Sequence, residues 1–370
     1  MPPERELCAA RQAHQDWLRL SFPWKEEKRA LFIQGFFFAY KRPIVAANPK
    51  KPFAKKAETT TQLVARIENR GLTLNANEKS DLFGLLYTVG YYRFTGFCLP
   101  FQQRNRPNKG KFLANTSLRH ITALYDFDTE LRALCGQALE KIEVYVRNTI
   151  CEHMSRTHNP HWYVDNACFR RNFADLKTKA ERNVFFDATS NQPSRDFHPD
   201  SHLFLAHYYT TYDPPAIPPA WMHRECASFG YWAKAYASLS TADQKAIAAR
   251  FAFPNRKPID AVLLEDWFQS VSIFRNRCAH HTRITYRTFP FAPNVPTNNP
   301  CNTAFGKKQD DLRTILLVIT LLVKHIAPTC TWRASLHSLI DKSKTDVAIE
   351  RATGIGDGYG GWANDPLWTI

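Results

Sequence analysis

The sequence lacks the short motifs that mark most metal, disulfide and nucleotide sites. Its nine cysteines are odd in number and widely spaced, and no two form a Cys-x-x-Cys pair. This argues against a zinc knuckle and against a secreted disulfide framework. The chain also has no Gly-x-x-x-x-Gly-Lys and no Gly-x-Gly-x-x-Gly loop, which argues against nucleoside triphosphatases and dinucleotide-binding proteins. We therefore predict a protein of the reducing cytoplasm that holds no metal and no cofactor.

Long hydrophobic runs and strand patterns are scarce as well. The most apolar run, Ile315 to Val323, is far shorter than the ~20 residues that a membrane span needs, so we predict a buried helix there. The first residues do not have the basic-then-apolar pattern of a signal peptide. No solenoid repeat, heptad run or strand-rich region is present. These absences predict a soluble all-α protein without membrane association.

What the chain has in excess is positive charge. Its 49 lysines and arginines outnumber its 34 acidic residues, which gives a net charge of +15. Such an excess says nothing about the fold, but it favours a polyanionic partner, and a nucleic acid before a membrane. A basic surface without any nucleic-acid role remains the alternative.

Apolar residues at helical spacing define the expected helices. The clearest pattern covers residues 117–156, which predicts one long amphipathic helix or two helices that bend near Gly136. The segment Gly90 to Phe101, with two glycines and a proline, argues against a regular helix throughout. Further helices are expected at residues 60–70, 77–89, 221–239, 241–251, 259–281 and 315–326.

The segment Phe274-Arg-Asn-Arg-Cys-Ala-His-His281, at the end of one expected helix, offers the chemistry for cleaving RNA without a metal. Such cleavage needs a group that takes the proton of the 2′-hydroxyl, a group that protonates the departing 5′-oxygen, and cations that hold the phosphate. Histidine suits the proton steps because it titrates near neutral pH. The planar fork of arginine matches phosphate. We therefore take Arg275, Asn276 and His280 as candidate catalytic residues.

Helix geometry limits this interpretation. On an ideal helix Asn276 and His280 lie about 40° apart, whereas Arg275 and His280 lie about 140° apart. Arg275 and His280 therefore do not share a face unless the helix ends or distorts there. A site built from two helices, each with an arginine and a histidine, would remove the difficulty.

A second Arg-His segment could be the partner. Arg147-Asn-Thr-Ile-Cys-Glu-His153 ends the long expected helix, and it makes Arg147 and His153 the second pair of catalytic candidates. The alternative is structural, because Glu143 and Arg147 have the i,i+4 spacing of an ion pair on a solvated helix face.

Three other interpretations compete for these and nearby residues. His280 and His281 could bind a metal, but no His-Glu-x-x-His spacing supports this. Asp126 and Asp128 could be metal ligands, although capping or solvated roles are more typical of such residues near a helix. Cys278 could be a nucleophile, but its place on an apolar stripe favours the core.

Several blocks, in order along the chain, resemble the bacterial abortive-infection family of the AbiD/AbiF type. They are Gly90-Tyr-Tyr-Arg-Phe-Thr-Gly-Phe-Cys-Leu-Pro-Phe101, Leu124-Tyr-Asp-Phe-Asp-Thr-Glu-Leu-Arg132, Leu139-Glu-Lys-Ile-Glu143 with Arg147, Pro218-Pro-Ala-Trp-Met222, Ser228-Phe-Gly230 and Arg275-Asn-Arg-Cys-Ala-His-His281. Together they cover about Lys51 to Arg287.

The resemblance implies a HEPN-like helical bundle. In HEPN ribonucleases two Arg-x(4–6)-His motifs meet in one cleft, and cleavage there needs no metal and leaves a cyclic phosphate. By that pattern Arg275, Asn276 and His280 carry over, and Arg147 and His153 fit the looser spacing. The expected organisation is an N-terminal helical extension (1–50), an Abi/HEPN-like core with irregular insertions (51–290), C-terminal helices packed on it (291–350) and a Gly-rich tail (351–370).

The expected function is therefore that of an RNA-binding protein of anti-phage defence, a metal-independent endoribonuclease that acts as a toxin and is bound to a structured noncoding RNA. The alternative is an inactive module that only holds a structured RNA. The sequence leaves open whether the cleft forms within one chain or across a homodimer. The candidate RNA-binding residues are Lys50, Lys51, Lys55, Lys56, Arg93, Arg104, Arg106, Lys109, Lys111, Arg170, Arg171, Arg277 and Arg283.

Overall fold

The computed structural model describes residues 52–170, 203–212, 217–297, 299–305, 310–343 and 365–368. These residues form eleven α-helices and no β-strand, with three isolated β-bridges, so the predicted all-α fold is confirmed. The predicted N-terminal extension (1–50) and most of the Gly-rich tail (351–370) lie outside the described residues. So do three of the candidate RNA-binding residues, Lys50, Lys51 and Arg171.

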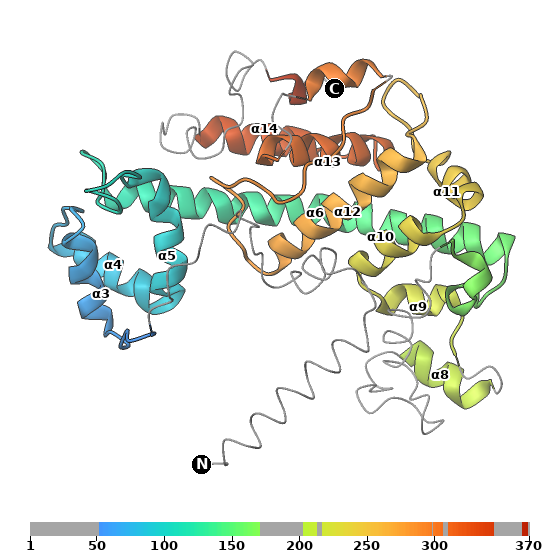
Figure 1. The fold of residues 1–370 in the computed structure, drawn as a ribbon, viewed down its shortest axis with the longest axis horizontal. Coiled ribbons are helices and arrows are strands. Elements are labelled where there is room, and N and C mark those ends of the chain that lie inside the picture. The colour runs from blue at the N-terminus through green and yellow to red at the C-terminus, as the bar shows by residue number, and fades with distance from the viewer. Residues whose placement is uncertain are drawn as a thin grey trace.

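One long helix, α6 (Leu118–Thr157), runs through the middle of the molecule (Figure 1). Ser117 and His120 form a capping box at its start, in which the side chain of each accepts a hydrogen bond from the backbone N–H of the other. The helix continues through Gly136 without a break, so the structure selects the single helix from the two predicted arrangements. Its 40 residues span about 60 Å at 1.5 Å per residue.

The N-terminal end of α6 packs against a small helical lobe, which we define as residues 52–117. The lobe contains α3 (Thr60–Glu68), α4 (Ala76–Val89) and α5 (Tyr91–Cys98), which gather around that end of α6 in Figure 1. Capping boxes begin α3 at Thr59 and α4 at Asn75. The lobe has its own apolar core, which ends at Leu124 of α6.

The segment 90–101 contains more helix than its glycines and proline predicted. Residues 91–98 form α5, and a 3₁₀ turn, Leu99–Phe101, follows it. Gly90, at φ 85°, stands before the helix and Pro100 stands after it, so neither interrupts it. Only Gly96 lies inside the helix, where a glycine costs about 1 kcal/mol relative to alanine. Burial of Phe94 and Phe97 in the lobe core offsets that cost.

A larger core surrounds the rest of α6. It is formed with α9 (Ala220–Cys226), α10 (Phe229–Ser238), α11 (Thr241–Ala248), α12 (Ala261–Ala279), α13 (Leu312–Ile326) and α14 (Trp332–Ser343), and α8 (Leu203–Thr211) lies beside α9 (Figure 1). The remaining short 3₁₀ helices are Trp162–Val164, Asn166–Cys168, Pro300–Ala304 and Pro366–Trp368.

The predicted helix 221–239 is two helices in the structure. The chain turns at Ala227, and the Ser228 hydroxyl then caps α10 by accepting from the backbone N–H of Tyr231. The predicted buried helix at 315–326 is confirmed as α13, in which every residue from Leu312 to Val323 is buried. Among the described residues, no helix combines the length and apolarity that crossing a membrane requires.

The chain that follows α12 is tied to α6 by Asp128. This carboxylate is fully buried, and one of its oxygens accepts from the backbone N–H groups of Ile284 and Thr285 at 2.9 and 2.8 Å and from the Thr285 hydroxyl at 2.8 Å. Its other oxygen pairs with Arg132. Asp128 is therefore neither a solvated residue nor a cap, and no cluster of metal-ligating side chains occurs in the described part of the chain. Its role is to fix the end of α12 against α6.

Candidate functional site

The Arg-His segment lies at the C-terminal end of α12. Asp260 caps the start of the helix, and Trp267, Val271, Phe274 and Cys278 bury one side of it. The helix ends at Ala279, and His280 leaves it with φ −87° and ψ 14° while its backbone N–H still donates to the Asn276 carbonyl at 2.9 Å. The helix therefore ends next to His280, but the retained hydrogen bond keeps His280 close to its helical position, about 140° around the axis from Arg275.

Two arginines from different helices meet on one carboxylate. Arg275 of α12 donates from Nε to one oxygen of Glu143 at 2.9 Å, and Arg147 of α6 pairs with the other oxygen. Glu143 is buried, with 6% of its surface exposed, while the side chains of Arg147 and Arg275 remain 17% and 38% exposed. Burial lowers the pKa of the Arg147 guanidinium, and the neighbouring Arg275 acts in the same direction, against the opposing effect of Glu143.

A cavity of about 400 Å³ opens beside this arginine pair. This volume lies within the range of small-molecule sites. The cavity is lined by both charged and apolar side chains, namely Arg132, Gly136, Leu139, Glu140, Glu143, Val144, Arg147, Arg275, Cys278 and Ala279.

The other candidates on α12 flank the cavity. The Asn276 side-chain oxygen accepts from Nη1 of Arg275 at 3.4 Å. His280 is exposed and follows Ala279, which lines the cavity. Cys278 is buried, and burial raises the pKa of its thiol to about 12, as expected of a core cysteine rather than a nucleophile.

His153 lies elsewhere. Its Nε2 is 2.8 Å from Oδ1 of Asp243 on α11, and the same carboxylate holds Nε2 of His158 at 3.1 Å. The Ser240 hydroxyl donates to Asp243 at 2.6 Å. Along α6, six residues separate Arg147 from His153, which turns them about 120° apart. The structure thus brings Arg147 to Arg275 but directs His153 to α11.

The hydrogen bonds to the Asp243 carboxylate stabilise its charged form. Burial tends to raise its pKa, but hydrogen bonds from Ser240, His153 and His158 outweigh burial and place the pKa below its ordinary value of 3.8. We name Asp243, His153, His158 and Ser240 the Asp243 cluster. It fastens the C-terminal end of α6 to α11.

The predicted RNA-binding residues fall into two groups. Six are exposed side chains of the small lobe, Lys55, Lys56, Arg104, Arg106, Lys109 and Lys111, and of these Arg104 lies 5.1 Å from the centroid of the Tyr286 ring. Four others make contacts within the protein. Arg93 donates to the His281 carbonyl, and Arg170 pairs with Glu265 at 3.1 Å. Arg283 donates to the Gly96 carbonyl, and Arg277 lies 5.0 Å from the centroid of the buried Phe289 ring.

In this conformation Arg277 is buried and Arg283 is half-buried. Arg277 is 7% exposed, and burial lowers the pKa of both guanidinium groups to about 10. Arg277 also faces the ring of Phe291, and Arg283 faces that of Phe97, so both act as cation–π partners inside the fold.

Glu143 is the site residue that the sequence did not reveal. Its i,i+4 spacing to Arg147 predicted a pair on a solvated face, whereas the structure buries it against α12. The available signal was its neighbourhood, because Ile142 and Val146 mark this side of α6 as apolar. A carboxylate on the edge of such a stripe needs a buried cation.

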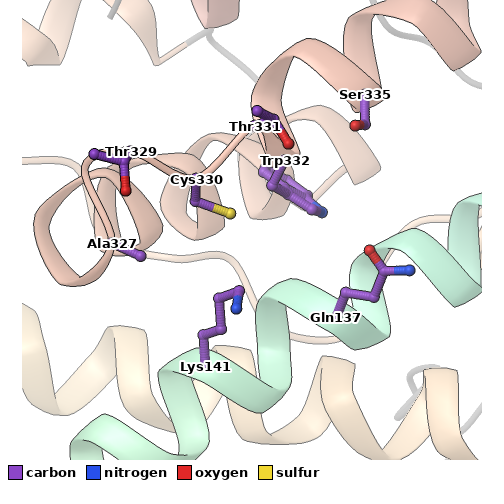
Figure 2. A pocket seen from close by; sticks show the side chains of 8 residues that line it. All are labelled: Gln137, Lys141, Ala327, Thr329, Cys330, Thr331, Trp332 and Ser335. Carbon is purple, nitrogen blue, oxygen red and sulfur yellow. The ribbon is translucent and has the colours of Figure 1, made fainter.

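A second cavity, of about 420 Å³, lies between α6 and the α13–α14 connection. Figure 2 shows Lys141 and Gln137 of α6 facing Cys330, Thr331 and Trp332 across it. Lys141 and Glu143 are two residues apart and so point about 160° away from each other around α6. The second cavity is therefore separate from the arginine pair, and its lining contains the cation of Lys141 and the thiol of Cys330 but no histidine and no carboxylate.

The fold and the site define an all-helical protein with an arginine-rich cavity between two of its longest helices. Comparison with known families matches residues 84–285, more than half of the chain, to the family described as Abi-like protein, and the chain belongs to that family. Membership indicates a role in abortive infection, a defence against phage. No curated protein and no solved structure matches the chain. The matched range contains Glu143, Arg147, Arg275 and His280.

Proposed function

We propose that this protein is a metal-independent endoribonuclease of phage defence, of the HEPN type that its motifs resemble, and that it acts as a toxin. The observation that carries the proposal is the meeting of Arg147 and Arg275, from two helices, beside a cavity of about 400 Å³. Two guanidinium groups that converge on one oxyanion also suit a phosphodiester. In the structure the carboxylate of Glu143 is the anion between the two guanidinium groups, and it sets the spacing between them.

The chemistry needs no further cation. The 2′-oxygen attacks the adjacent phosphorus, the bond from phosphorus to the 5′-oxygen breaks, and the products are a 2′,3′-cyclic phosphate and a 5′-hydroxyl. One base takes the proton from the 2′-hydroxyl, and one acid returns a proton to the 5′-oxygen. We assign one of these steps to His280, and we assign to Arg147 and Arg275 the stabilisation of the charge that builds on the phosphoryl oxygens. Asn276 orients Arg275 through its side-chain oxygen.

The second proton-transfer group is proposed to come from another copy of the chain. Because His153 is bonded to Asp243, the structure supports a structural role for it. A homodimer would bring a second His280 to the cleft, and each copy would supply one half of the site.

Replacement of His280 tests the proposal. His280→Ala is expected to lower the rate of RNA cleavage in EDTA by at least a factor of about 100, the scale of general acid–base catalysis. The thermal unfolding midpoint should not change, because His280 is exposed. His207→Ala, which replaces an exposed histidine of α8, is the matched control. Equal cleavage by wild type and His280→Ala would remove the proposal.

The second candidate function is an RNA-binding module without catalysis. It is favoured by the full pairing of Arg147 with Glu143, which already neutralises one of the two arginines. In the same EDTA assay this module would leave purified RNA intact but bound. Sequencing of the RNA that co-purifies with the protein would show whether either form holds a structured noncoding RNA.

A further inference from the structure

The small lobe exposes three large aromatic side chains within ten residues. Phe83 and Tyr87 of α4 are 43% and 78% exposed, and Tyr92 at the start of α5 is 93% exposed. Phe83 and Tyr87 are one turn apart and so lie on the same helix face. We call these three residues the aromatic surface. Large exposed apolar groups that lie close together in the chain are candidates for an interaction site.

The aromatic surface does not contribute to the core of the lobe. The core is filled by Leu82 and Leu86 of α4 and by Phe94 and Phe97 of α5, all of which are buried. On α4 the exposed pair follows the buried pair by one residue, about 100° around the helix. The helix therefore has an apolar face that packs and an aromatic face that is left to solvent.

The charge of the lobe indicates what the aromatic surface binds. Ten lysines and arginines against four acidic residues give residues 52–117 a net charge of +6. The loop from α5 to α6 alone exposes Arg104, Arg106, Lys109 and Lys111. Basic side chains with exposed aromatic rings are the combination that binds single-stranded nucleic acid, since phosphates pair with the cations and bases stack on the rings.

The α5 helix also touches the end of α12. Arg93, which follows Tyr92, donates to the His281 carbonyl, and the Gly96 carbonyl accepts from Arg283. The turn that carries His280 is thus held by α5, the helix whose first turn carries Tyr92. A strand bound on α5 would lie close to the chain that positions the candidate catalytic histidine.

We propose that Phe83, Tyr87 and Tyr92 form a binding site for single-stranded RNA, on which unpaired bases stack. The choice of RNA as ligand rests on the proposed function. The site is distinct from the arginine cavity, and it would hold the strand through its bases while the arginines hold the scissile phosphate.

Binding of a 12-nucleotide, fluorescently labelled, 2′-O-methyl RNA tests the proposal, because this strand lacks the nucleophile and stays intact. Stacking on an aromatic ring is worth about 1–3 kcal/mol per base, which is roughly 5- to 150-fold in Kd. The double variant Tyr87→Ala/Tyr92→Ala is therefore expected to weaken binding at least tenfold with an unchanged salt dependence. Tyr87→Phe/Tyr92→Phe should bind like wild type, since the rings remain.

Two further variants separate stacking from charge and from position. Lys109→Ala/Lys111→Ala should flatten the dependence of log Kd on log salt concentration by roughly 0.7 for each phosphate that the variant no longer neutralises. Tyr212→Ala, an exposed tyrosine after α8, should leave Kd unchanged. The exposure of all these residues predicts unchanged thermal midpoints.

Unchanged affinity of the Tyr87→Ala/Tyr92→Ala variant, or no binding of the strand by wild type, would overturn the proposal. If the Tyr87→Ala/Tyr92→Ala variant bound RNA with unchanged affinity but differed from wild type in its molar mass by light scattering, the aromatic surface would instead be an interface between copies of the chain. Failure of the proposed function has a separate readout, in which His280→Ala cleaves unmodified RNA at the wild-type rate. Each result can occur without the other.

Discussion

At the scale of single residues, Glu143 determines the geometry of the arginine pair. A carboxylate between two guanidinium groups fixes both forks, because each arginine donates to a different oxygen. These two partners together offset the cost of burying the Glu143 charge. Glu143 is therefore a positioning residue, and its contribution should be visible in stability even without RNA.

Glu143→Gln is expected to lower the free energy of unfolding by about 1–3 kcal/mol, since it weakens two charge-assisted hydrogen bonds and leaves two cations side by side. Urea denaturation measures the change. Cleavage should also fall, because Arg147 and Arg275 lose their common anchor.

Glu140→Gln is the matched control. It lies one turn earlier on α6, lines the same cavity and is exposed. Its stability should stay within about 0.5 kcal/mol of wild type. If Glu143→Gln were equally neutral, the carboxylate would not be holding the arginines.

At the scale of elements, the Asp243 cluster joins the end of α6 to α11. Two histidines share one carboxylate, and Ser240 completes its hydrogen bonding. Such a joint is local, but it closes a loop of 90 residues between His153 and Asp243. This separation explains why the sequence could suggest His153 as catalytic, since nothing adjacent to it indicates its partner.

His153→Ala is expected to lower the unfolding free energy at neutral pH by about 1–3 kcal/mol, because the largely buried Asp243 loses a hydrogen bond. Cleavage per folded molecule should change much less than in His280→Ala. Thermal unfolding and RNA cleavage, measured on the same samples, distinguish a structural from a catalytic histidine. A large loss of cleavage with no loss of stability would restore His153 to the catalytic site.

The sign of the pH dependence follows from Asp243. Its pKa is lowered in the folded state, so the stability that it contributes is present above the unfolded value of 3.8 and is lost as the pH falls through the folded value. The difference between wild type and His153→Ala should therefore shrink in acid and be full at neutral pH.

Elements defined by local pattern were predictable, and those defined by partners were not. The apolar spacing and the cap at Ser117 suffice for α6, as the stripe from Trp267 to Cys278 does for α12. The α5 helix was missed because glycine and proline were counted without regard to their positions at its ends. The burial of Glu143 depends on which helix packs over it, and no local rule contains that information.

At the scale of the whole molecule, a buried ion pair joins α13 to the C-terminal segment. Arg313 donates to the two oxygens of Asp365 at 2.7 and 2.8 Å, and both residues are at most 2% exposed. Asp365 also accepts from the backbone N–H of Leu367, which is buried in the main core. The segment 365–368 is thus part of the folded unit.

Asp365→Ala is expected to cost about 3–5 kcal/mol, because it removes the counter-charge of a buried guanidinium. Arg313→Met in the Asp365→Ala background should recover part of that loss, since the uncompensated charge is then gone. Chemical denaturation of the two single variants and the double variant gives the coupling. Strictly additive losses would show that the two side chains do not stabilise each other.

The unbroken α6 also restricts how this chain can vary. Leu124 is its last residue in the core of the small lobe, and Phe127 is its first in the main core. One inserted residue between them would turn the two cores about 100° relative to each other and advance one by about 1.5 Å. The helix therefore fixes the rotation of the two cores relative to each other. Residues can be inserted or deleted in the loops, but the number of residues between Leu124 and Phe127 has to stay the same.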